Sequence, residues 1–204
     1  MSDEFDTLQV TRKTGTEKFL INGAESAFAL ADFWGWSTSD LMNNSLRGML
    51  AEFIVATAIG TDLKNTHRVE WDAYDLISNE GVKIEVKSSA YLQSWKQTKL
   101  SAISFEIHPT FGYNDDKGKY EDETKRQADV YVFCVLKHKD RLTVNPLDLG
   151  QWDFYIISSK VLNEKVGNQK SIGLSSLLKL KPIFASYNEI SKAIHIANRF
   201  YAEL

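Results

Sequence analysis

A hairpin near the middle of the chain constrains the fold more than any other feature. Residues 82–88 alternate between apolar and polar types, which is typical of a strand with one buried face. Residues 69–77 alternate less regularly. Between the two segments, Asn79-Glu80-Gly81 has the composition of a three-residue hairpin loop that ends in a left-handed glycine. We therefore predict two antiparallel strands joined by this turn.

The length of the turn sets which residues face one another. A three-residue loop places Leu76 opposite Ile84 and Asp75 opposite Glu85. Because side chains alternate along a strand, Asp75, Glu85 and Lys87 are then expected on one face of the hairpin. The apolar residues between them would turn to the other face, toward the core.

The pattern before the hairpin predicts a helix. The N-cap residue types at 37–40 precede it, and Gly60 is suited to the position just after its end. Its apolar stripe is made of Met42, Leu46, Met49, Leu50, Phe53 and Ile54. Glu52 lies at the edge of that stripe, among the small residues Ser45, Gly48 and Ala56. A short strand is expected at 18–21.

The pattern after the hairpin predicts further strands and a helical end. Strands are expected at 101–107, 129–136 and 152–157, with the second of these central in the sheet because it is apolar throughout. Residues 109–127 are expected to form a long exposed loop. Ser186 and Glu189 have the spacing of a capping box before a final helix that extends to Phe200.

Together these elements predict an α/β (α+β) domain of three layers, in which helices flank a mixed central β-sheet. We expect one domain over residues 1–204, with its core at about 40–160 and a helical annex at about 161–204. The single cysteine, Cys134, excludes an internal disulfide and makes a cysteine-rich zinc site implausible. No apolar leader or run of ~20 apolar residues occurs, so we expect a cytoplasmic protein without a membrane segment.

The facing carboxylates point to a metal ion. Two like charges directly opposite each other in a sheet destabilise it, and a cation between Asp75 and Glu85 would remove that repulsion. Oxygen ligands of this kind suit Mg²⁺ or Mn²⁺. Lys87 could neutralise the pair or position a water molecule against a phosphate. These are the parts that hydrolysis of a phosphodiester requires.

Three segments together resemble the PD-(D/E)xK nuclease superfamily, which includes many restriction endonucleases. They are Arg47-Gly48-Met49-Leu50-Ala51-Glu52, Tyr74-Asp75-Leu76 and Ile84-Glu85-Val86-Lys87-Ser88-Ser89. The resemblance covers about residues 40–136. It implies a restriction-endonuclease-like core with the element order αβββαβ, although the sequence pattern shows no helix between the third and fourth strands. Tyr74 stands where the motif has its proline.

The resemblance also implies roles for four residues. Asp75 and Glu85 would bind the metal, Lys87 would be the catalytic lysine, and Glu52 would contact the metal directly or through water. Asp72 is an alternative to Asp75 if the hairpin register differs, although its parity along the strand is opposite.

Further residues are candidates for contact with nucleic acid, and they are Gln93, Trp95, Lys96, Lys99 and Arg126. Trp95 offers a ring for stacking, and the lysines offer charge. The net charge of −3 does not by itself favour a nucleic-acid binder. The four histidines have no metal-ligand spacing.

The function expected from these features is that of a Mg²⁺-dependent nuclease acting on DNA, an endonuclease of restriction or repair type. Two alternatives stay open, namely a non-catalytic nucleic-acid-binding module of the same fold and an RNA-processing nuclease. Cleavage of both strands of a duplex would favour a homodimer, since one site cuts one strand.

Overall fold

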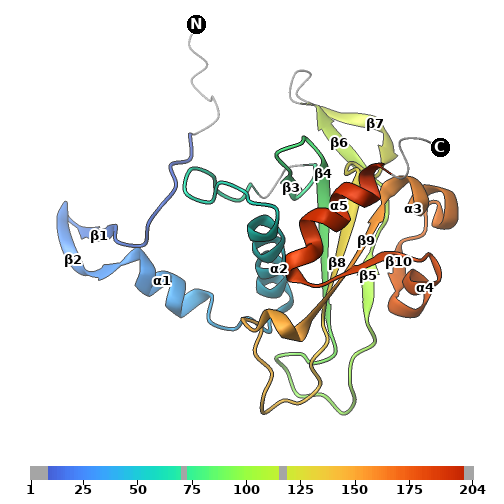
Figure 1. The fold of residues 1–204 in the computed structure, drawn as a ribbon. Coiled ribbons are helices and arrows are strands. Elements are labelled where there is room, and N and C mark those ends of the chain that lie inside the picture. The colour runs from blue at the N-terminus through green and yellow to red at the C-terminus, as the bar shows by residue number, and fades with distance from the viewer. Residues whose placement is uncertain (1–8, 70–72, 115–118, 200–204) are drawn as a thin grey trace, which may run out of the picture. The chain divides into compact units, whose positions relative to one another are not determined.

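The computed structural model describes residues 9–69, 73–114 and 119–199 (Figure 1). The chain divides into two compact units. The first comprises Met1–Ser39 and Asp62–His67, and the second comprises Asp40–Thr61 and Arg68–Leu204. Each is described by itself, and the expectation of a single domain over 1–204 stays a prediction.

The smaller unit is a hairpin followed by a helix. Strand β1 (Lys18–Ile21) pairs with β2 (Ala24–Ala29), and helix α1 (Leu30–Ser37) follows. Asn22 and Gly23 form the turn with φ angles of 52° and 84°, as a two-residue hairpin loop with two left-handed positions requires. The predicted strand at 18–21 is confirmed, whereas β2 and α1 were not predicted.

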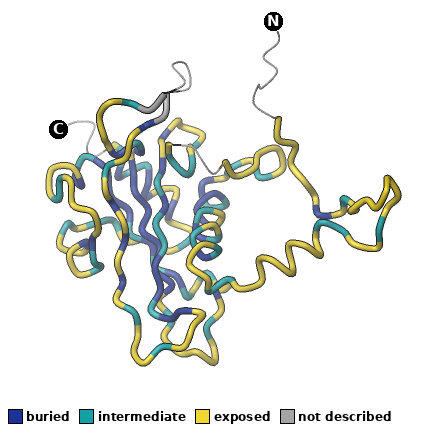
Figure 2. Tube along the Cα trace, turned by 180° about the vertical axis from the view of Figure 1, so that it is seen from behind, coloured by how far each residue is buried: buried dark blue, intermediate teal, exposed yellow. Residues whose placement is uncertain are grey.

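Apolar side chains of the smaller unit are largely exposed (Figure 2). Among its described residues only Gly15 is buried, beneath the ring of Trp34. The exposed large apolar residues are Val10, Phe19, Leu20, Ile21, Phe28, Phe33, Trp34 and Trp36. This unit therefore has almost no core of its own.

The larger unit is built on a five-stranded mixed sheet with the order β11-β9-β8-β4-β3. Its strands are β3 (Leu76–Ile77), β4 (Lys83–Ala90), β8 (Val130–Leu136), β9 (Trp152–Ser158) and β11 (Ile183–Ala185). Strands β4 and β8 are parallel, and the other neighbours are antiparallel. Every residue of β8 is buried, so the predicted apolar central strand is confirmed, as is the strand predicted at 152–157.

Helices flank this sheet, which confirms the predicted α/β (α+β) class (Figures 1 and 2). Helices α2 (Asn44–Ala58) and α5 (Ile190–Arg199) share one apolar cluster with the even-numbered residues of β8. Helices α3 (Ser159–Val166) and α4 (Leu174–Lys179) share a second cluster with its odd-numbered residues up to Val135. The two faces of β8 thus each contribute to a separate apolar core.

Of the two predictions for residues 101–127, the strand at 101–107 is confirmed and the exposed loop at 109–127 is wrong. The third strand, β5 (Ser104–Glu106), lies in a separate two-stranded sheet with β10 (Ser171–Gly173). The expected loop at 109–127 contains a further hairpin, β6 (Thr110–Asn114) with β7 (Lys119–Lys125). Charged residues dominate β7, and a strand without a buried face leaves no apolar alternation to detect.

The start of the first predicted helix is also corrected. The N-cap types at 37–40 do not cap α2, because Asn43 does so by accepting a hydrogen bond from the Ser45 amide at 3.0 Å. The predicted end is confirmed. Gly60 has a φ of 74°, and the Thr61 amide donates to the carbonyl of Ala56 at 3.0 Å.

The buried face of α2 is rotated from the predicted stripe. Ala51, Ile54 and Val55 are buried, whereas Met49 and Phe53 are 40% and 54% exposed. Small residues such as Ala51 permit the helix to lie close to the sheet. Because they contribute little to an apolar pattern, the sequence did not indicate which face of α2 is buried.

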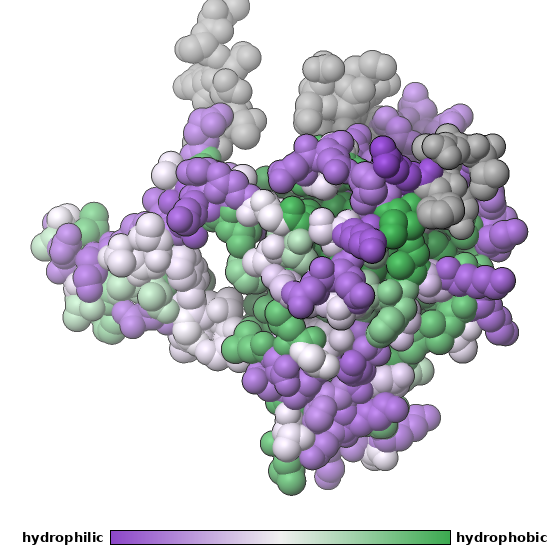
Figure 3. All heavy atoms as spheres, viewed as in Figure 1, coloured by the Kyte–Doolittle hydropathy of each residue, from purple (hydrophilic) through white to green (hydrophobic). Residues whose placement is uncertain are grey.

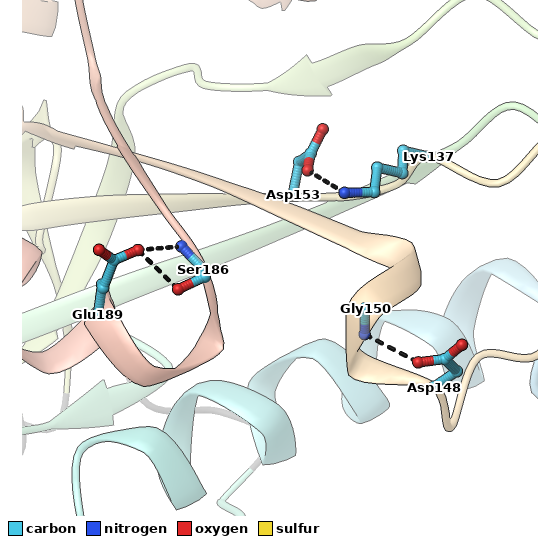
Figure 4. Close-up of polar contacts among 6 residues, drawn as sticks. All are labelled: Lys137, Asp148, Gly150, Asp153, Ser186 and Glu189. Carbon is cyan, nitrogen blue, oxygen red and sulfur yellow. Dashed lines mark hydrogen bonds and ion pairs between the residues drawn. The ribbon is translucent and has the colours of Figure 1, made fainter.

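The end of the chain follows the prediction more closely. A 3-10 turn, η3 (Tyr187–Glu189), leads into α5, and the Glu189 carboxylate accepts hydrogen bonds from the amide and hydroxyl of Ser186 at 2.9 and 2.6 Å (Figure 4). This confirms the predicted capping box. Phe200, the expected end of the helix, lies outside the described residues. A second 3-10 turn, η2 (Leu149–Gln151), is capped by Asp148 at the amide of Gly150 (Figure 4).

The turn between β3 and β4 has the predicted geometry. Gly81 has a φ of 81°, and its amide donates to the Ser78 carbonyl at 2.9 Å. The Ser78 amide donates to the carbonyl of Val82 at 3.0 Å, which closes the three-residue loop. Only glycine adopts this left-handed conformation without strain.

We predict opposite effects of one substitution at two glycines. Gly81→Ala should lower the free energy of unfolding by about 1 kcal/mol, because alanine is strained at this φ. Gly48→Ala should raise it by roughly 0.5–1 kcal/mol, since Gly48 lies inside α2 and a Cβ there would meet nothing within 4 Å. Urea unfolding measures both, and effects of the same sign would contradict the geometry of the turn.

Candidate active site

The hairpin register brings Asp75 to the edge of the sheet. Leu76 pairs with Ile84, as predicted. The regular antiparallel pairing of β3 with β4 ends at Leu76. The preceding residue, Asp75, donates its amide to the Ile84 carbonyl at 3.1 Å and does not pair with Glu85 in the ladder. Its carboxylate accepts a hydrogen bond from the Val86 amide at 2.7 Å. Asp75 is thus fixed against the backbone of β4 and not within a plain cross-strand pair with Glu85.

Glu85 and Lys87 lie two residues apart on β4. The Lys87 Nζ and Glu85 Oε1 are 2.5 Å apart, and the side chains are 32% and 19% exposed. In the parallel ladder Glu85 pairs with Tyr131 and Lys87 pairs with Phe133. The two aromatic rings stack with centroids 5.9 Å apart. An aromatic floor therefore lies beside the ion pair and limits its contact with water.

Glu52 comes from α2 and is paired with Arg68. Its two carboxylate oxygens accept hydrogen bonds from Nε and Nη2 of Arg68 at 2.5 and 3.2 Å. Such a bidentate pair fixes the carboxylate in one orientation. Sequence reasoning did not single out Arg68, because nothing in its spacing links it to a helix residue 16 positions earlier.

The electrostatics of Asp75 link all four predicted residues. The pKa of Asp75 is raised from 3.8 to about 7, chiefly by burial and next by the negative charge of Glu85. The hydrogen bond from Val86 lowers the pKa, the charge of Glu52 raises it further, and the charge of Lys87 lowers it. The structure therefore brings Glu52, Asp75, Glu85 and Lys87 into one electrostatic group.

The neighbouring cation and phenol respond to the same acidic pair. Burial by itself lowers the pKa of Lys87, but the hydrogen bond to Glu85 and the charges of Glu85, Asp75 and Glu106 together outweigh it, so the net pKa is raised. Burial, followed by the charge of Glu85, raises the pKa of Tyr131. Lys87 is accordingly an ammonium ion near neutral pH, and Tyr131 is a neutral phenol.

The acidic group suits a hard divalent cation only in part. Within the described residues, no three or more His, Cys, Asp or Glu side chains are arranged to hold a metal ion. Glu52 is turned to Arg68, which leaves Asp75 and Glu85 as the donor pair. Mg²⁺ commonly takes one or two carboxylates and keeps several waters, so two such oxygen donors fit it.

Two of the weaker candidates are engaged inside the protein. Gln93 is buried, donates to the Ala90 carbonyl at 3.0 Å and accepts a hydrogen bond from Arg47 at 3.4 Å. Arg126 is buried too, and its terminal nitrogens donate to Asn163 and to the carbonyl of Gly167 at 2.6 and 2.8 Å. Neither has a described hydrogen bond to the four central residues.

The remaining candidates lie elsewhere. Trp95, Lys96 and Lys99 are exposed on the loop that follows β4. Asp72, the alternative to Asp75, lies outside the described residues. The choice of Asp75 therefore rests on the register of the hairpin, in which Leu76 pairs with Ile84.

Sequence reasoning missed Tyr131 and Arg47. Tyr131 could have been found by pairing the central strand with β4 in parallel, whereas the apolar run alone does not specify a partner strand. Arg47 belongs to the quoted motif but had no assigned role. It is buried and donates from Nη2 to Asn44 at 2.8 Å and from Nε to Ser88 at 3.3 Å, so it ties α2 to the strand that carries Lys87.

Comparison with known protein families places the chain among the endonucleases. Residues 26–176 match the family model described as bacteriophage T4 endonuclease IV. The match spans more than half of the chain, and the chain belongs to this family. It covers α2, the hairpin and β4, which carry the acidic group. No curated protein sequence matches the chain. Within the described residues, no helix is both long and apolar enough to cross a membrane.

We predict that Asp75→Asn stabilises the metal-free protein at pH 8. The folded state holds a proton on Asp75 that the unfolded chain releases above about pH 4, so folding stability is lost as the pH rises from about 4 to 7. Removing the charge should raise the free energy of unfolding by about 1 kcal/mol or more at pH 8, and by less at pH 5.

Thermal unfolding in EDTA at both pH values measures this difference. Asp153→Asn is the matched control, since Asp153 is paired with Lys137 at 2.7 Å and its loss removes an attraction. An equal gain for both variants at pH 8 would contradict the repulsion at Asp75.

Proposed function

We propose that this chain is a Mg²⁺- or Mn²⁺-dependent endonuclease that hydrolyses phosphodiester bonds in DNA. The observation that carries the proposal is the half-buried acidic pair, Asp75 and Glu85, with Lys87 beside it. The raised pKa of Asp75 means that its charged form is unfavourable beside Glu85 without a cation, and groups perturbed in this way concentrate at functional sites. A restriction or repair role is part of this proposal, as is the cytoplasmic location.

Membership of the PD-(D/E)xK superfamily is the second part of the proposal. The hairpin register and the Glu85-x-Lys87 spacing on an adjacent central strand support it. So does α2, which supplies Glu52. The element order differs at one point. Between β5 and β8 the described residues form the β6–β7 hairpin, where the resemblance implies a helix.

Asp75 and Glu85 would hold the ion by their carboxylates. When bound, a divalent cation supplies positive charge that activates a water molecule and stabilises the phosphoryl oxygens. The Val86 amide holds the Asp75 carboxylate in place through its hydrogen bond. The Asp75 carboxylate is thus preorganised by the backbone of β4, and that of Glu85 by the Lys87 side chain.

Lys87 would act as a charged hydrogen-bond donor. Its raised pKa keeps it protonated near neutral pH, so it orients the attacking water or the phosphate and is not suited to removing a proton. The aromatic floor formed by Tyr131 and Phe133 keeps the ammonium partly desolvated, which strengthens its attraction to an anionic phosphate.

Glu52 would act through its charge on Asp75. Arg68 holds it in a bidentate pair, so it is a weaker metal ligand than the sequence analysis expected. An outer position, in which Glu52 contacts the hydration water of the ion, agrees with both its orientation and its influence on the pKa of Asp75.

We predict that Lys87→Ala lowers the rate of DNA cleavage at least 100-fold, because it removes the only positive charge paired with Glu85 among the described residues. Lys83→Ala is the matched control on the same strand, and it should leave the rate within about threefold. Plasmid cleavage with Mg²⁺ or Mn²⁺ measures both. The proposed function is wrong if the wild type cleaves neither DNA nor RNA with any divalent ion.

Binding of the ion is tested separately from cleavage. Mg²⁺ at millimolar concentration should raise the melting temperature of the wild type, since a ligand that binds only the folded state stabilises it. Asp75→Asn and Glu85→Gln should each abolish that rise, whereas Asp153→Asn should retain it. Equal rises for all four proteins would show that the ion binds elsewhere.

A further inference from the structure

Two loops leave the same edge of the central sheet. One follows β4 and covers residues 91–101, and the other follows β8 and covers residues 137–148. Because β4 and β8 are parallel, their carboxyl ends meet at one edge. Figure 1 shows both loops together at the lower end of the larger unit.

Arg141 joins the two loops. Its Nη2 donates to the Trp95 carbonyl at 3.0 Å and to Oε1 of Gln97 at 2.7 Å. Gln97 in turn donates to Ser101 at 3.0 Å, which holds the first loop in a closed shape. Lys139 from the second loop lies over the ring of Tyr91, 4.6 Å from its centroid. The pair of loops is therefore one connected surface.

The second loop is also fixed at its base. Lys137 and Asp153 form an ion pair at 2.7 Å, and Asp148 caps η2 (Figure 4). Within the loop, Thr143 donates to Asp140 at 2.9 Å and contacts His138 at 2.7 Å. A preorganised surface loses less entropy when it binds a ligand.

The surface of the loop pair is basic, whereas the chain as a whole is acidic. The two segments hold five basic residues (Lys96, Lys99, Lys137, Lys139 and Arg141) against two acidic ones (Asp140 and Asp148), although the net charge of the chain is −3. Lys96, Lys99 and Lys139 are exposed, and within the described part of the chain none forms an ion pair. Figure 3 shows mainly hydrophilic side chains at this end.

One aromatic ring stands out on this basic surface. Trp95 is 53% exposed although its backbone is held by Arg141. An exposed indole beside lysines combines a stacking platform with phosphate-binding charge, which is the combination that nucleic-acid strands require.

We propose that the loop pair 91–101 and 137–148 is a second contact surface for the nucleic-acid substrate, on which Lys96, Lys99 and Lys139 bind phosphates and Trp95 stacks against a base. The inference rests on the proposed function, in which Asp75, Glu85 and Lys87 act on the phosphodiester bond. It adds the segment 137–148, to which the sequence analysis gave no role.

Binding is measured with fluorescein-labelled 20-nucleotide DNA, single-stranded and duplex, by anisotropy of the full-length protein in EDTA. Replacing Lys96, Lys99 and Lys139 by Gln together should weaken binding at least tenfold and reduce the slope of log K against log salt by about 2–3. Trp95→Ala should weaken binding of the single strand by roughly 5- to 150-fold. Circular dichroism confirms that each variant is folded.

A second triple variant serves as the control with the same change in net charge. It replaces the exposed Lys165, Lys170 and Lys179 by Gln, and Trp36→Ala controls for loss of an exposed indole. If the loop variants bind as tightly as these controls while the wild type cleaves DNA, the inference is wrong and the proposed function stands. If the loop variants lose binding but the wild type cleaves nothing, the surface is supported and the proposed function fails. Loss of both binding and cleavage in the wild type overturns both.

Discussion

The half-buried position of the Asp75 carboxylate next to that of Glu85 is the constraint on which the site depends. Asp75 lies at the edge of the sheet, held by the Val86 amide, and the charges of Glu85 and Glu52 both raise its pKa. This arrangement lowers the free energy of unfolding at neutral pH, because burial and like charge both raise the pKa of Asp75. A bound cation would reverse that balance, and Lys87 offsets it only in part.

The rest of the larger unit supports this group. The parallel pairing of β4 with the fully buried β8 places Tyr131 and Phe133 beside Glu85 and Lys87 and fixes the strand between two apolar clusters. Arg47 ties α2 to β4 at Ser88, and α2 carries Glu52, whose charge acts on Asp75. Membership of the bacteriophage T4 endonuclease IV family gives this arrangement an enzymatic context, since the match includes all of these elements.

Local chemistry explains which features the sequence could predict. The turn at Asn79-Glu80-Gly81 has few conformational solutions, so it predicted the register Leu76–Ile84, and the strongly apolar β8 could only be central. The hairpin β6–β7, the separate β5–β10 sheet and the pairing of Glu52 with Arg68 depend on long-range contacts without a periodic signal. The apolar stripe also predicted the wrong buried face for α2, because the helix contacts the sheet partly through small residues such as Ala51.

The titration of Asp75 tests the central claim most directly. Carbon-13 NMR of the side-chain carboxyl, followed against pH, reports its pKa in the metal-free protein and again with Mg²⁺. The repulsive pair predicts a pKa of about 7 without the ion and a value well below this when the ion is bound. An ordinary value near 3.9 in both conditions would show that Asp75 is neither repelled by Glu85 nor shared with a cation.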